Sequence, residues 1–373
     1  MHTEDLEAFI RSKGIPSSDV IIYHKHKEIF RFINGTKDSE GKIPLKGDEL
    51  YLFYSATKPI TCVAAMRLVE KGIIGIEDPV YKYIPEYENL SYMDGNSVKK
   101  CKNVMTVRHL FTMRGGLSYN LDMPSIKECI KNNPNADTLE IVKSFVKEPL
   151  SFEPGTNYQY SLCHDVLAAV IEVATNMKFG EFLKKEIFEP LGMTRTGFYH
   201  KNSELSSQFA TQYRYENGIY YPHPLTTMRF NFTKNYESGG AGLYSCIDDY
   251  VKFADAMANK GTAANGYQLL KPETVDLMRV NQNEFELPPP PPLRPGLGYG
   301  FGMRVMLDKR LAKSDAPSEF EFGWNGAAGT FVSMDAHHGL TCVYVQHVFN
   351  HSWIYTDVHP VIRDTAYYLA GIS

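Results

Sequence analysis

The sequence predicts an α+β fold: an antiparallel sheet built from both ends of the chain, flanked by helices, with a mostly helical region inserted between them. β-rich runs occur near the start, within residues 20–34, and near the end, within residues 300–349. Between them the sequence shows helical periodicity and long loops, with few convincing strands. We therefore expect residues 1–79 and 262–373 to form an α/β sheet domain, residues 80–261 to form a helical region, and the active site to lie in the cleft between them.

The N-terminal part begins with a short amphipathic pattern that predicts a helix over Asp5–Lys13. Two β-rich runs follow, Val20–His24 and Ile29–Asn34, and the four polar residues between them predict a hairpin. A polar loop leads to an apolar helical pattern that ends near Lys71–Gly72, where a basic residue precedes a glycine.

The remaining elements are predicted in the same way from apolar spacing and breaker residues. The predicted helices of the middle region are Val107–Met113, Asp137–Lys147, Cys163–Thr175, Phe179–Ile187 and Ile247–Asn259. The predicted C-terminal elements are strands over Gly300–Leu307, Gly329–Asp335 and Leu340–Phe349 and a closing helix over Asp357–Ala370.

The composition is that of a globular protein, with 43% hydrophobic and 22% charged residues in a chain of 373. A net charge of -4 argues against binding to nucleic acid or to anionic membranes. No apolar run approaches the ~20 residues of a membrane span, and residues 1–17 lack the apolar core of a signal peptide. Six scattered cysteines without Cys-x-x-Cys spacing predict free thiols in a reducing compartment, so we expect a cytoplasmic protein.

Ser55 and Lys58, in the stretch Tyr51–Thr61, are the first candidate catalytic residues. Residues three apart share a helix face, so the two side chains can meet. A lysine held neutral can accept the proton of a serine hydroxyl, and a helix N-terminus offers free N–H groups to an oxyanion. The alternative is ordinary, because serine often caps a helix and Ser-x-x-Lys arises by chance.

Two further stretches carry candidate site residues. Tyr160 lies at a predicted loop–helix junction, where a phenol near an ammonium can act as a base, although a packed aromatic is the simpler interpretation. The glycine-rich stretch Phe322–Thr330 precedes a strand, and its glycines allow the backbone to approach a ligand closely. A glycine-rich hairpin without a ligand is the alternative.

The segment Leu287–Gly302 contains five consecutive prolines and several glycines. Such a run favours polyproline II, so it forms either a stiff lip over a cleft or partner site, or a surface connector. His347 and His351 have helix-type metal spacing but lie at the end of a predicted strand, so we expect no metal site. The sequence also lacks the Gly-x-Ser-x-Gly elbow and the phosphate-binding loop, and we expect no cofactor.

Taken in order, these stretches resemble the serine β-lactamase and penicillin-binding-protein superfamily, in particular its class C-like branch with esterase, D-aminopeptidase and carboxypeptidase relatives. The resemblance runs from about Leu50 to the C-terminus. Its supporting stretches are Thr106–Leu110, Phe152–Tyr160, Pro190–Thr196 and Gly239–Ser245.

The resemblance implies a role for each matching residue. Ser55 matches the acylated nucleophile, Lys58 the lysine that takes or shares its proton, and Tyr160 the tyrosine of a Tyr-x-Asn motif, a general base. The backbone N–H groups of Ser55 and Ala327 would form the oxyanion hole. The positions that would bind substrate are Leu162, Trp324, Asn325 and Gly326.

Two departures from the family pattern bear on the substrate. Leu162 stands where an asparagine usually binds the substrate amide, and Trp324 replaces a cation that attracts a substrate carboxylate. The resemblance therefore implies an acyl-enzyme serine hydrolase acting on a small ester, amide or short peptide, with esterase activity favoured. A β-lactamase, a D-amino-acid peptidase or an acyltransferase is the alternative, and a non-catalytic binding or scaffold relative is a second one.

Overall fold

The computed structural model describes residues 1–199, 204–283, 290–316 and 318–372. Its main feature is an antiparallel sheet that, within these ranges, has seven strands in the order β10-β11-β12-β13-β14-β1-β2. The strands are β1 (Ser17–His24), β2 (Lys27–Gly35), β10 (Leu297–Tyr299), β11 (Arg304–Met306), β12 (Glu321–Asn325), β13 (Phe331–Asp335) and β14 (Leu340–Gln346). β1 pairs with β14, with Ile21 opposite Val343, so the two chain ends meet in mid-sheet. The predicted α+β class with a sheet from both ends is confirmed.

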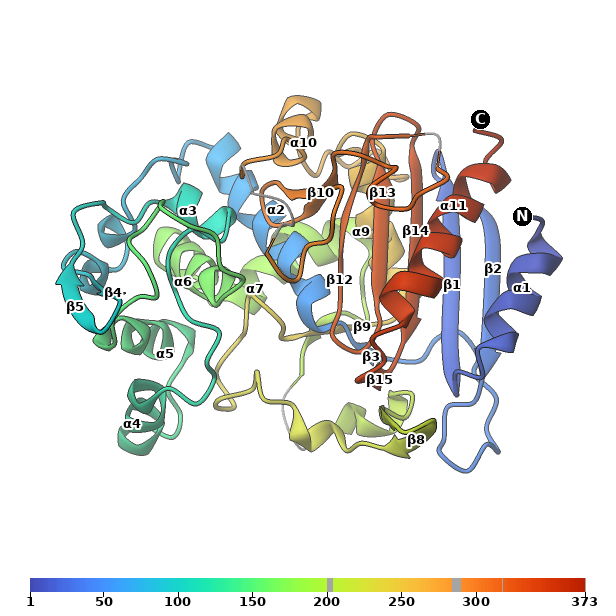
Figure 1. Ribbon diagram of the computed structural model, residues 1–373, viewed down its shortest axis with the longest axis horizontal. Coiled ribbons are helices and arrows are strands. Elements are labelled where there is room, and N and C mark those ends of the chain that lie inside the picture. Colours follow the sequence, from blue (N-terminus) through green and yellow to red (C-terminus); the bar gives the residue numbers. More distant parts are fainter. Residues whose placement is uncertain (200–203, 284–289, 317, 373) are drawn as a thin grey trace.

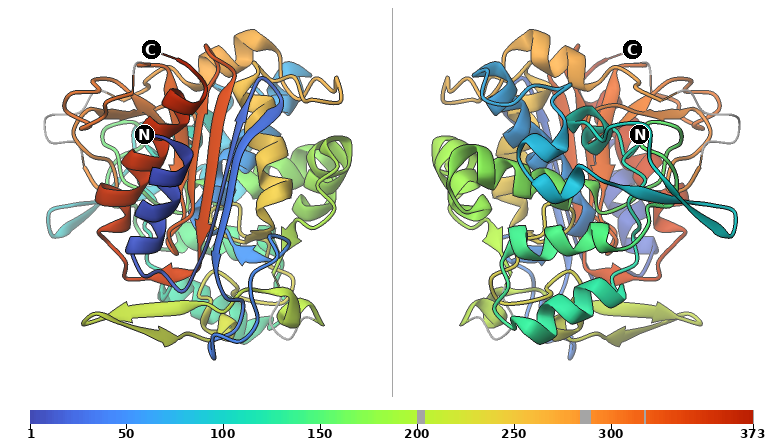
Figure 2. Two further views of the ribbon diagram at one scale, coloured as in Figure 1. Left: turned by 90° about the vertical axis from the view of Figure 1, so that its right-hand side faces the viewer. Right: turned by 90° about the vertical axis from the view of Figure 1, so that its left-hand side faces the viewer.

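Helices cover both faces of this sheet (Figures 1 and 2). On one face lie α1 (Thr3–Ser12) and α11 (His359–Leu369), which contact each other and pack on β2 and β14. On the other face α9 (Ile247–Ala258) packs on β1, β13 and β14, and α2 (Thr57–Glu70) packs on β12. The helix α2 is buried almost throughout, because sheet and helical region enclose it from both sides.

The middle of the chain forms a helical region beside the sheet (Figure 1). Its helices are α3 (Val107–Phe111), α4 (Pro124–Asn132), α5 (Thr138–Ser144), α6 (Cys163–Thr175), α7 (Phe179–Leu183) and α8 (Glu189–Leu191), and α10 (Pro272–Met278) follows α9. Single turns of 3₁₀ or π type are η1 (Tyr54–Ala56), η2 (Val80–Lys82), η3 (Pro85–Tyr87), η4 (Phe145–Lys147), η5 (Lys184–Phe188), η6 (Glu204–Gln208), η7 (Leu225–Thr227) and η8 (Ile354–Val358). The core of this region is α6, which packs against α2, α3 and α5.

Several short strands connect these parts, and the sequence did not predict them in the middle region. They are β3 (Tyr51–Leu52), β4 (Ser91–Asp94), β5 (Ser97–Lys100), β6 (Gly197–Phe198), β7 (Tyr213–Glu216), β8 (Ile219–Pro222), β9 (Leu243–Ser245) and β15 (Val348–Phe349). In the small sheet β3-β9-β6, the strand β3 immediately precedes η1 and α2 in the chain. The position of this sheet therefore sets where the chain enters α2.

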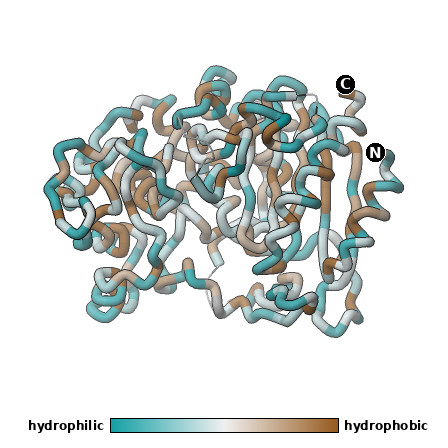
Figure 3. The backbone as a smooth tube through the Cα atoms, viewed as in Figure 1, coloured by the Kyte–Doolittle hydropathy of each residue, from teal (hydrophilic) through white to brown (hydrophobic). Residues whose placement is uncertain are grey.

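The predicted strand over Gly300–Leu307 is wrong in its first half. Gly302 has a φ of +80°, and a Cβ there would lie 2.2 Å from Sγ of Cys62, so the chain bends sharply and only β11 is extended. Hydrophilic residues concentrate along the outer loops and helices (Figure 3). Among the described residues no helix is both long and apolar enough to span a bilayer.

Candidate active site

Ser55 lies in the turn η1, between β3 and the first turn of α2. The residue before it, Tyr54, has a φ of +46°, in the left-handed region that side chains other than glycine rarely adopt. Buried contacts hold it there: its hydroxyl donates to Oε1 of Gln212 at 2.6 Å, and its ring packs against Phe349 at 4.9 Å. This sharp turn leaves Ser55 half-buried at the wall of a pocket.

Lys58 is fully buried one turn further along, in the first turn of α2. Its ammonium donates to the carbonyl oxygen of Gly240 at 2.7 Å and to the hydroxyl of Tyr119 at 3.5 Å. It also lies 4.5 Å from the centre of the Tyr160 ring. Among the described contacts Lys58 has no hydrogen bond to Ser55, so the direct contact expected from their spacing is absent in this state.

The surroundings of Lys58 keep it charged. Burial alone lowers the pKa of this amine, but Tyr119, Tyr160 and the buried carboxylate of Asp165 outweigh it, and the net effect raises the pKa above its usual value. The sequence analysis assigned base chemistry to a lysine held neutral. Oxygen atoms rather than other cations surround the amine, and its raised pKa favours the charged form.

Tyr160 lies in the loop before α6 and is held on three sides. Nε1 of Trp324 donates to its hydroxyl at 3.1 Å, Tyr119 stacks on its ring at 5.3 Å, and Lys58 lies against the ring. Tyr160 and Ser55 line the same pocket. Ser55 and Tyr160, which are far apart in the chain, thus line one pocket, with the buried Lys58 against the Tyr160 ring.

The glycine-rich turn after β12 forms the opposite wall. A Cβ on Gly326 would lie only 2.5 Å from the carbonyl oxygen of Phe53, so only glycine lets this turn approach the Ser55 segment so closely. The next N–H, that of Ala327, has no acceptor among the described residues, and neither has the N–H of Ser55. Two free N–H groups beside a hydroxyl are the components of an oxyanion hole.

The positions assigned to substrate binding differ in their surroundings. Asn325 and Gly326 line the pocket, and Oδ1 of Asn325 accepts from Nη1 of Arg304 at 3.1 Å. Trp324 also lines it but is only 5% exposed and contacts Tyr160 and Tyr299. Leu162 is a correction: it is 1% exposed in the hydrophobic core and does not line the pocket, because it precedes α6 on its packed side.

Tyr119, Gly240 and Asp165 complete the surroundings of Lys58; the sequence analysis gave none of them a role at the site, although Gly240 lies in one of its supporting stretches. Oδ1 of the buried Asp165 accepts from the hydroxyls of Tyr236 and Ser238, each at 2.6 Å, while Oδ2 has no partner in the described part of the chain. A Cβ on Gly240 would lie 2.7 Å from that Oδ2 and 3.4 Å from Nζ of Lys58. The available signal for Asp165 was a carboxylate in the first turn of the largely apolar helix α6.

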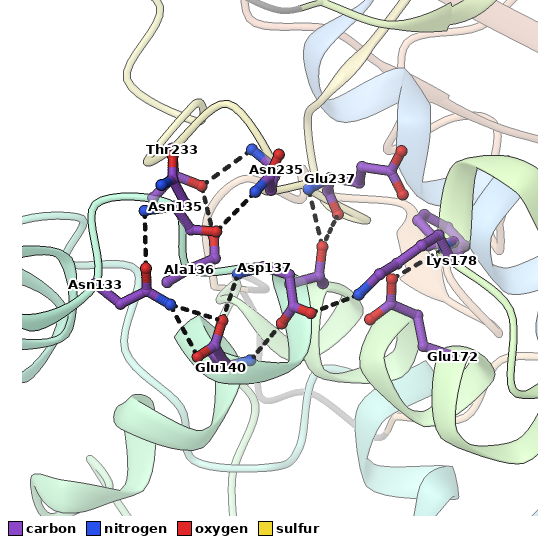
Figure 4. A network of polar contacts seen from close by, with 12 residues as sticks. Asn133, Asn135, Ala136, Asp137, Glu140, Glu172, Lys178, Thr233, Asn235 and Glu237 are labelled. Atoms are coloured by element: carbon purple, nitrogen blue, oxygen red, sulfur yellow. Dashed lines mark hydrogen bonds and ion pairs between the residues drawn. The ribbon is translucent and has the colours of Figure 1, made fainter.

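A polar network holds the segment that carries Gly240 (Figure 4). The hydroxyl of Thr233 donates to the carbonyl of Ala136 at 2.5 Å, and the N–H of Glu237 donates to the hydroxyl of Thr138 at 2.9 Å. Asp137 caps α5 and pairs with Lys178 at 2.5 Å. The start of α5 therefore fixes residues 233–237, which lead directly to Gly240 and its carbonyl.

The pocket in front of Ser55 has a volume of about 710 Å³. Besides the residues above, it is lined by Pro292, the last residue of the polyproline run, and by Leu293, Pro295 and Leu297, which follow it. The end of the segment thus lines the pocket; whether the segment is a stiff lip stays a prediction, and Leu287 to Pro289 lie outside the described residues.

His347 and His351, the two histidines with metal-type spacing, contact different polar groups. Nδ1 of His347 contacts the carbonyl of Ala210 at 3.0 Å, and Nε2 accepts from the N–H of Leu52 at 3.3 Å. Nδ1 of His351 contacts the side-chain amide of Gln346 at 3.1 Å. Among the described residues, no group of three or more His, Cys, Asp or Glu side chains is placed to hold a metal ion.

The model of the family described as "Beta-lactamase" matches residues 3–366 of this chain. The chain belongs to the Beta-lactamase family. The esterase EstB of Burkholderia gladioli is 31% identical to it over 349 residues, which cover 86% of this chain and 83% of EstB. The resemblance proposed from the sequence is confirmed.

Solved structures show the same family fold. EstCE1, described as a hydrolase with promiscuous acyltransferase activity, superimposes with a TM-score of 0.79 at 24% identity, covering 98% of this chain and 97% of EstCE1. Simvastatin synthase of Aspergillus terreus gives a TM-score of 0.78 at 19% identity, covering 98% of this chain and 97% of that enzyme. The chain is a member of the Beta-lactamase family of hydrolases whose relatives include esterases and acyltransferases.

Proposed function

We propose that this chain is a serine hydrolase that forms an acyl-enzyme on Ser55 with small ester or amide substrates, esters being favoured. The observation that carries the proposal is that Ser55, Tyr160 and Ala327 line one pocket, and that the backbone N–H groups of Ser55 and Ala327 have no acceptor among the described residues. Hydroxyl, base and oxyanion donors around one pocket are what acyl transfer needs.

In the proposed reaction Tyr160 accepts the proton of Ser55. Tyr160 enters this step as the phenolate, and the charged Lys58 ammonium that faces its ring stabilises this anion until the proton of Ser55 neutralises it. The N–H of Trp324 supports the same oxygen at 3.1 Å. Ser55 attacks the carbonyl carbon, the tetrahedral oxyanion is held by two backbone N–H groups, and the leaving alcohol takes the proton back from Tyr160.

The surroundings favour esters over β-lactams and peptides. Leu162 is buried in the core and offers no hydrogen bond to a substrate amide, and Trp324 puts an aromatic ring where a cation would attract a carboxylate next to the scissile bond. An ester carbonyl needs neither contact. The 31% identity with an esterase supports the same preference.

The test combines active-site labelling with turnover. Wild-type protein treated with a fluorophosphonate should gain one adduct by intact mass, and Ser55→Ala should gain none. Ser55→Ala should also lose turnover of p-nitrophenyl butyrate at an unchanged melting temperature. Ser352→Ala, which removes an exposed serine, is the matched control and should behave as wild type.

Residual ester turnover above a few per cent in Ser55→Ala would contradict Ser55 as the nucleophile. Absence of both adduct and turnover in the wild type would favour the non-catalytic scaffold instead. Faster hydrolysis of nitrocefin than of p-nitrophenyl butyrate would favour a β-lactamase.

Acyl transfer is the second candidate, because an acyl-enzyme can be released by an alcohol as well as by water. The promiscuous acyltransferase activity of EstCE1 supports it. Adding butanol to the butyrate assay and measuring butyl butyrate separates the two outcomes.

A further inference from the structure

The pocket continues from Ser55 toward α11, and three arginines line this far part. Arg294 comes from the loop before β10, Arg304 from β11 and Arg363 from α11. All three act on His359, which lines the same wall: burial first, and then these three guanidinium groups, lower the pKa of that imidazole well below its usual value. Three separate elements therefore bring positive charge to one cavity wall.

Two of the three arginines have a carboxylate partner. Arg304 forms an ion pair with the buried Glu321, and Nε of Arg363 contacts Oδ1 of Asp364 at 2.9 Å. Each of these charges is balanced within the protein. Nη2 of Arg363 is nevertheless buried without an acceptor in the described structure.

Arg294 has no such partner. Its Nη1 donates to the carbonyl oxygen of Tyr355, but among the described residues no carboxylate lies within 4.0 Å of its guanidinium group. It is half-buried, and burial together with the charge of Arg304 lowers its pKa. At the rim lie the exposed Lys313 and the exposed Asp357, and Asp357 acts electrostatically on Arg294 without forming an ion pair with it. The pocket wall thus carries about one uncompensated positive charge, which is costly to keep away from water.

We propose that this far part of the pocket binds a carboxylate carried by the substrate, several atoms from the carbonyl that Ser55 attacks, with Arg294 as its main partner. A single unmatched guanidinium fits a monoanion, and its planar fork of N–H donors matches a carboxylate. Apolar side chains of Leu293 and Leu297 lie along the same wall and suit an aliphatic spacer. The substrate class is then a carboxylate-bearing ester, such as the half-ester of a dicarboxylic acid.

This inference rests on the proposed function, but it places the anion away from the position that Trp324 occupies. A carboxylate directly beside the scissile bond would face that indole ring and not a cation. The anionic group therefore has to reach past Ser55 toward Arg294. Substrates that carry the charge too close to the ester gain nothing from this wall.

The kinetic test compares mono-p-nitrophenyl glutarate with p-nitrophenyl pentanoate, which has the same chain length without the charge. We expect wild-type kcat/KM to be higher for the glutarate. In Arg294→Gln the ratio of the two kcat/KM values should fall about tenfold or more, the loss typical for a hydrogen bond to a charged group. Arg294→Lys should restore part of the ratio. Arg214→Gln, an exposed arginine of β7 paired with Glu216, is the control and should leave the ratio unchanged.

A binding experiment keeps the inference independent of turnover. In the Ser55→Ala background, calorimetry would compare the mono-anilide of glutaric acid with its methyl ester. The charged anilide should bind more tightly, and adding Arg294→Gln should weaken it about tenfold or more while the ester changes little. This binding experiment tests the subsite even if the protein hydrolyses no ester. Absence of ester hydrolysis would overturn only the proposed function. Equal binding of both anilides, or a glutarate preference that survives Arg294→Gln, overturns the subsite.

Discussion

Replacing Trp324 by phenylalanine tests the site through one hydrogen bond. The change removes the N–H that donates to the Tyr160 hydroxyl at 3.1 Å and keeps an aromatic ring in the gap between Tyr160 and Tyr299. A hydrogen bond to a charged atom contributes about 1.5 to 3 kcal/mol. In the proposed mechanism Tyr160 must be the phenolate to accept the proton of Ser55, and the hydrogen bond from Trp324 stabilises this anionic form most.

The expected result is a change in pH dependence and not only in rate. Without the donor, the acid limb of the pH profile of kcat/KM should move up by roughly 1 to 2 units, because each unit corresponds to about 1.4 kcal/mol. Near neutral pH this gives a loss of about 10- to 100-fold, which becomes smaller as the pH rises. The assay is hydrolysis of p-nitrophenyl butyrate across the pH range in which the protein stays folded.

The control separates this effect from lost packing. The chain has two tryptophans, and the other, Trp353, contacts His351 and Lys13 and does not line the pocket. Trp353→Phe should leave the pH profile in place. If Trp324→Phe lowers the rate equally at every pH, the indole acts only by filling space. If the rate is unchanged, the Tyr160 oxygen does not take part in the reaction as proposed.

Two other predictions concern the oxyanion turn and a buried acid. Gly326→Ala should lower kcat/KM by about 100-fold or more, because its Cβ would lie 2.5 Å from the carbonyl oxygen of Phe53 and displace the N–H of Ala327. The control is Gly218→Ala, where φ is +85° but the space is open, and it should cost about 1 kcal/mol of stability and no activity. Equal activity of the two variants would contradict this prediction. Burial raises the pKa of Glu172 to about 7, from 4.5, so its neutral form stabilises the fold below pH 4.5 and this contribution is lost as the pH rises through 7. The difference in the free energy of unfolding between Glu172→Gln and wild type, measured in urea, should shift by about 3 kcal/mol in favour of the variant as the pH rises from 4.5 to 7. A difference that does not change with pH would contradict the raised pKa of Glu172 as its cause.

The sequence predicted those parts of the fold that have long, regular patterns. The hairpin β1–β2 and the helix α6 appear at or within a few residues of the predicted bounds, because alternating or helical apolar spacing extends over many residues there. The strands β6 and β9 have two and three residues and carry no period that a sequence could show. They exist because β9 pairs with β3 on one side and with β6 on the other, and this pairing depends on the tertiary fold.

The site shows the same division. Ser55 and Lys58 are three residues apart on one helix turn, so their motif is visible locally. Tyr119 carries no signal of its own, since the loop that brings it onto Tyr160 has no regular pattern. Arg294 follows a proline-rich run, and its lack of a carboxylate partner is a property of three converging elements, which no local pattern encodes.

The charge around Lys58 decides which group can act as the base in the proposed reaction. Its ammonium is held by the carbonyl of Gly240, with the carboxylate of Asp165 close behind, and removing its proton would leave that buried carboxylate without a nearby cation. In the proposed reaction the proton of Ser55 therefore leaves through Tyr160, which lines the same pocket and lies against Lys58. A side chain at position 240 would collide with Oδ2 of Asp165, so the glycine is what allows carbonyl, ammonium and carboxylate to meet. The chemistry at Ser55 thus depends on a backbone approach far away in the sequence.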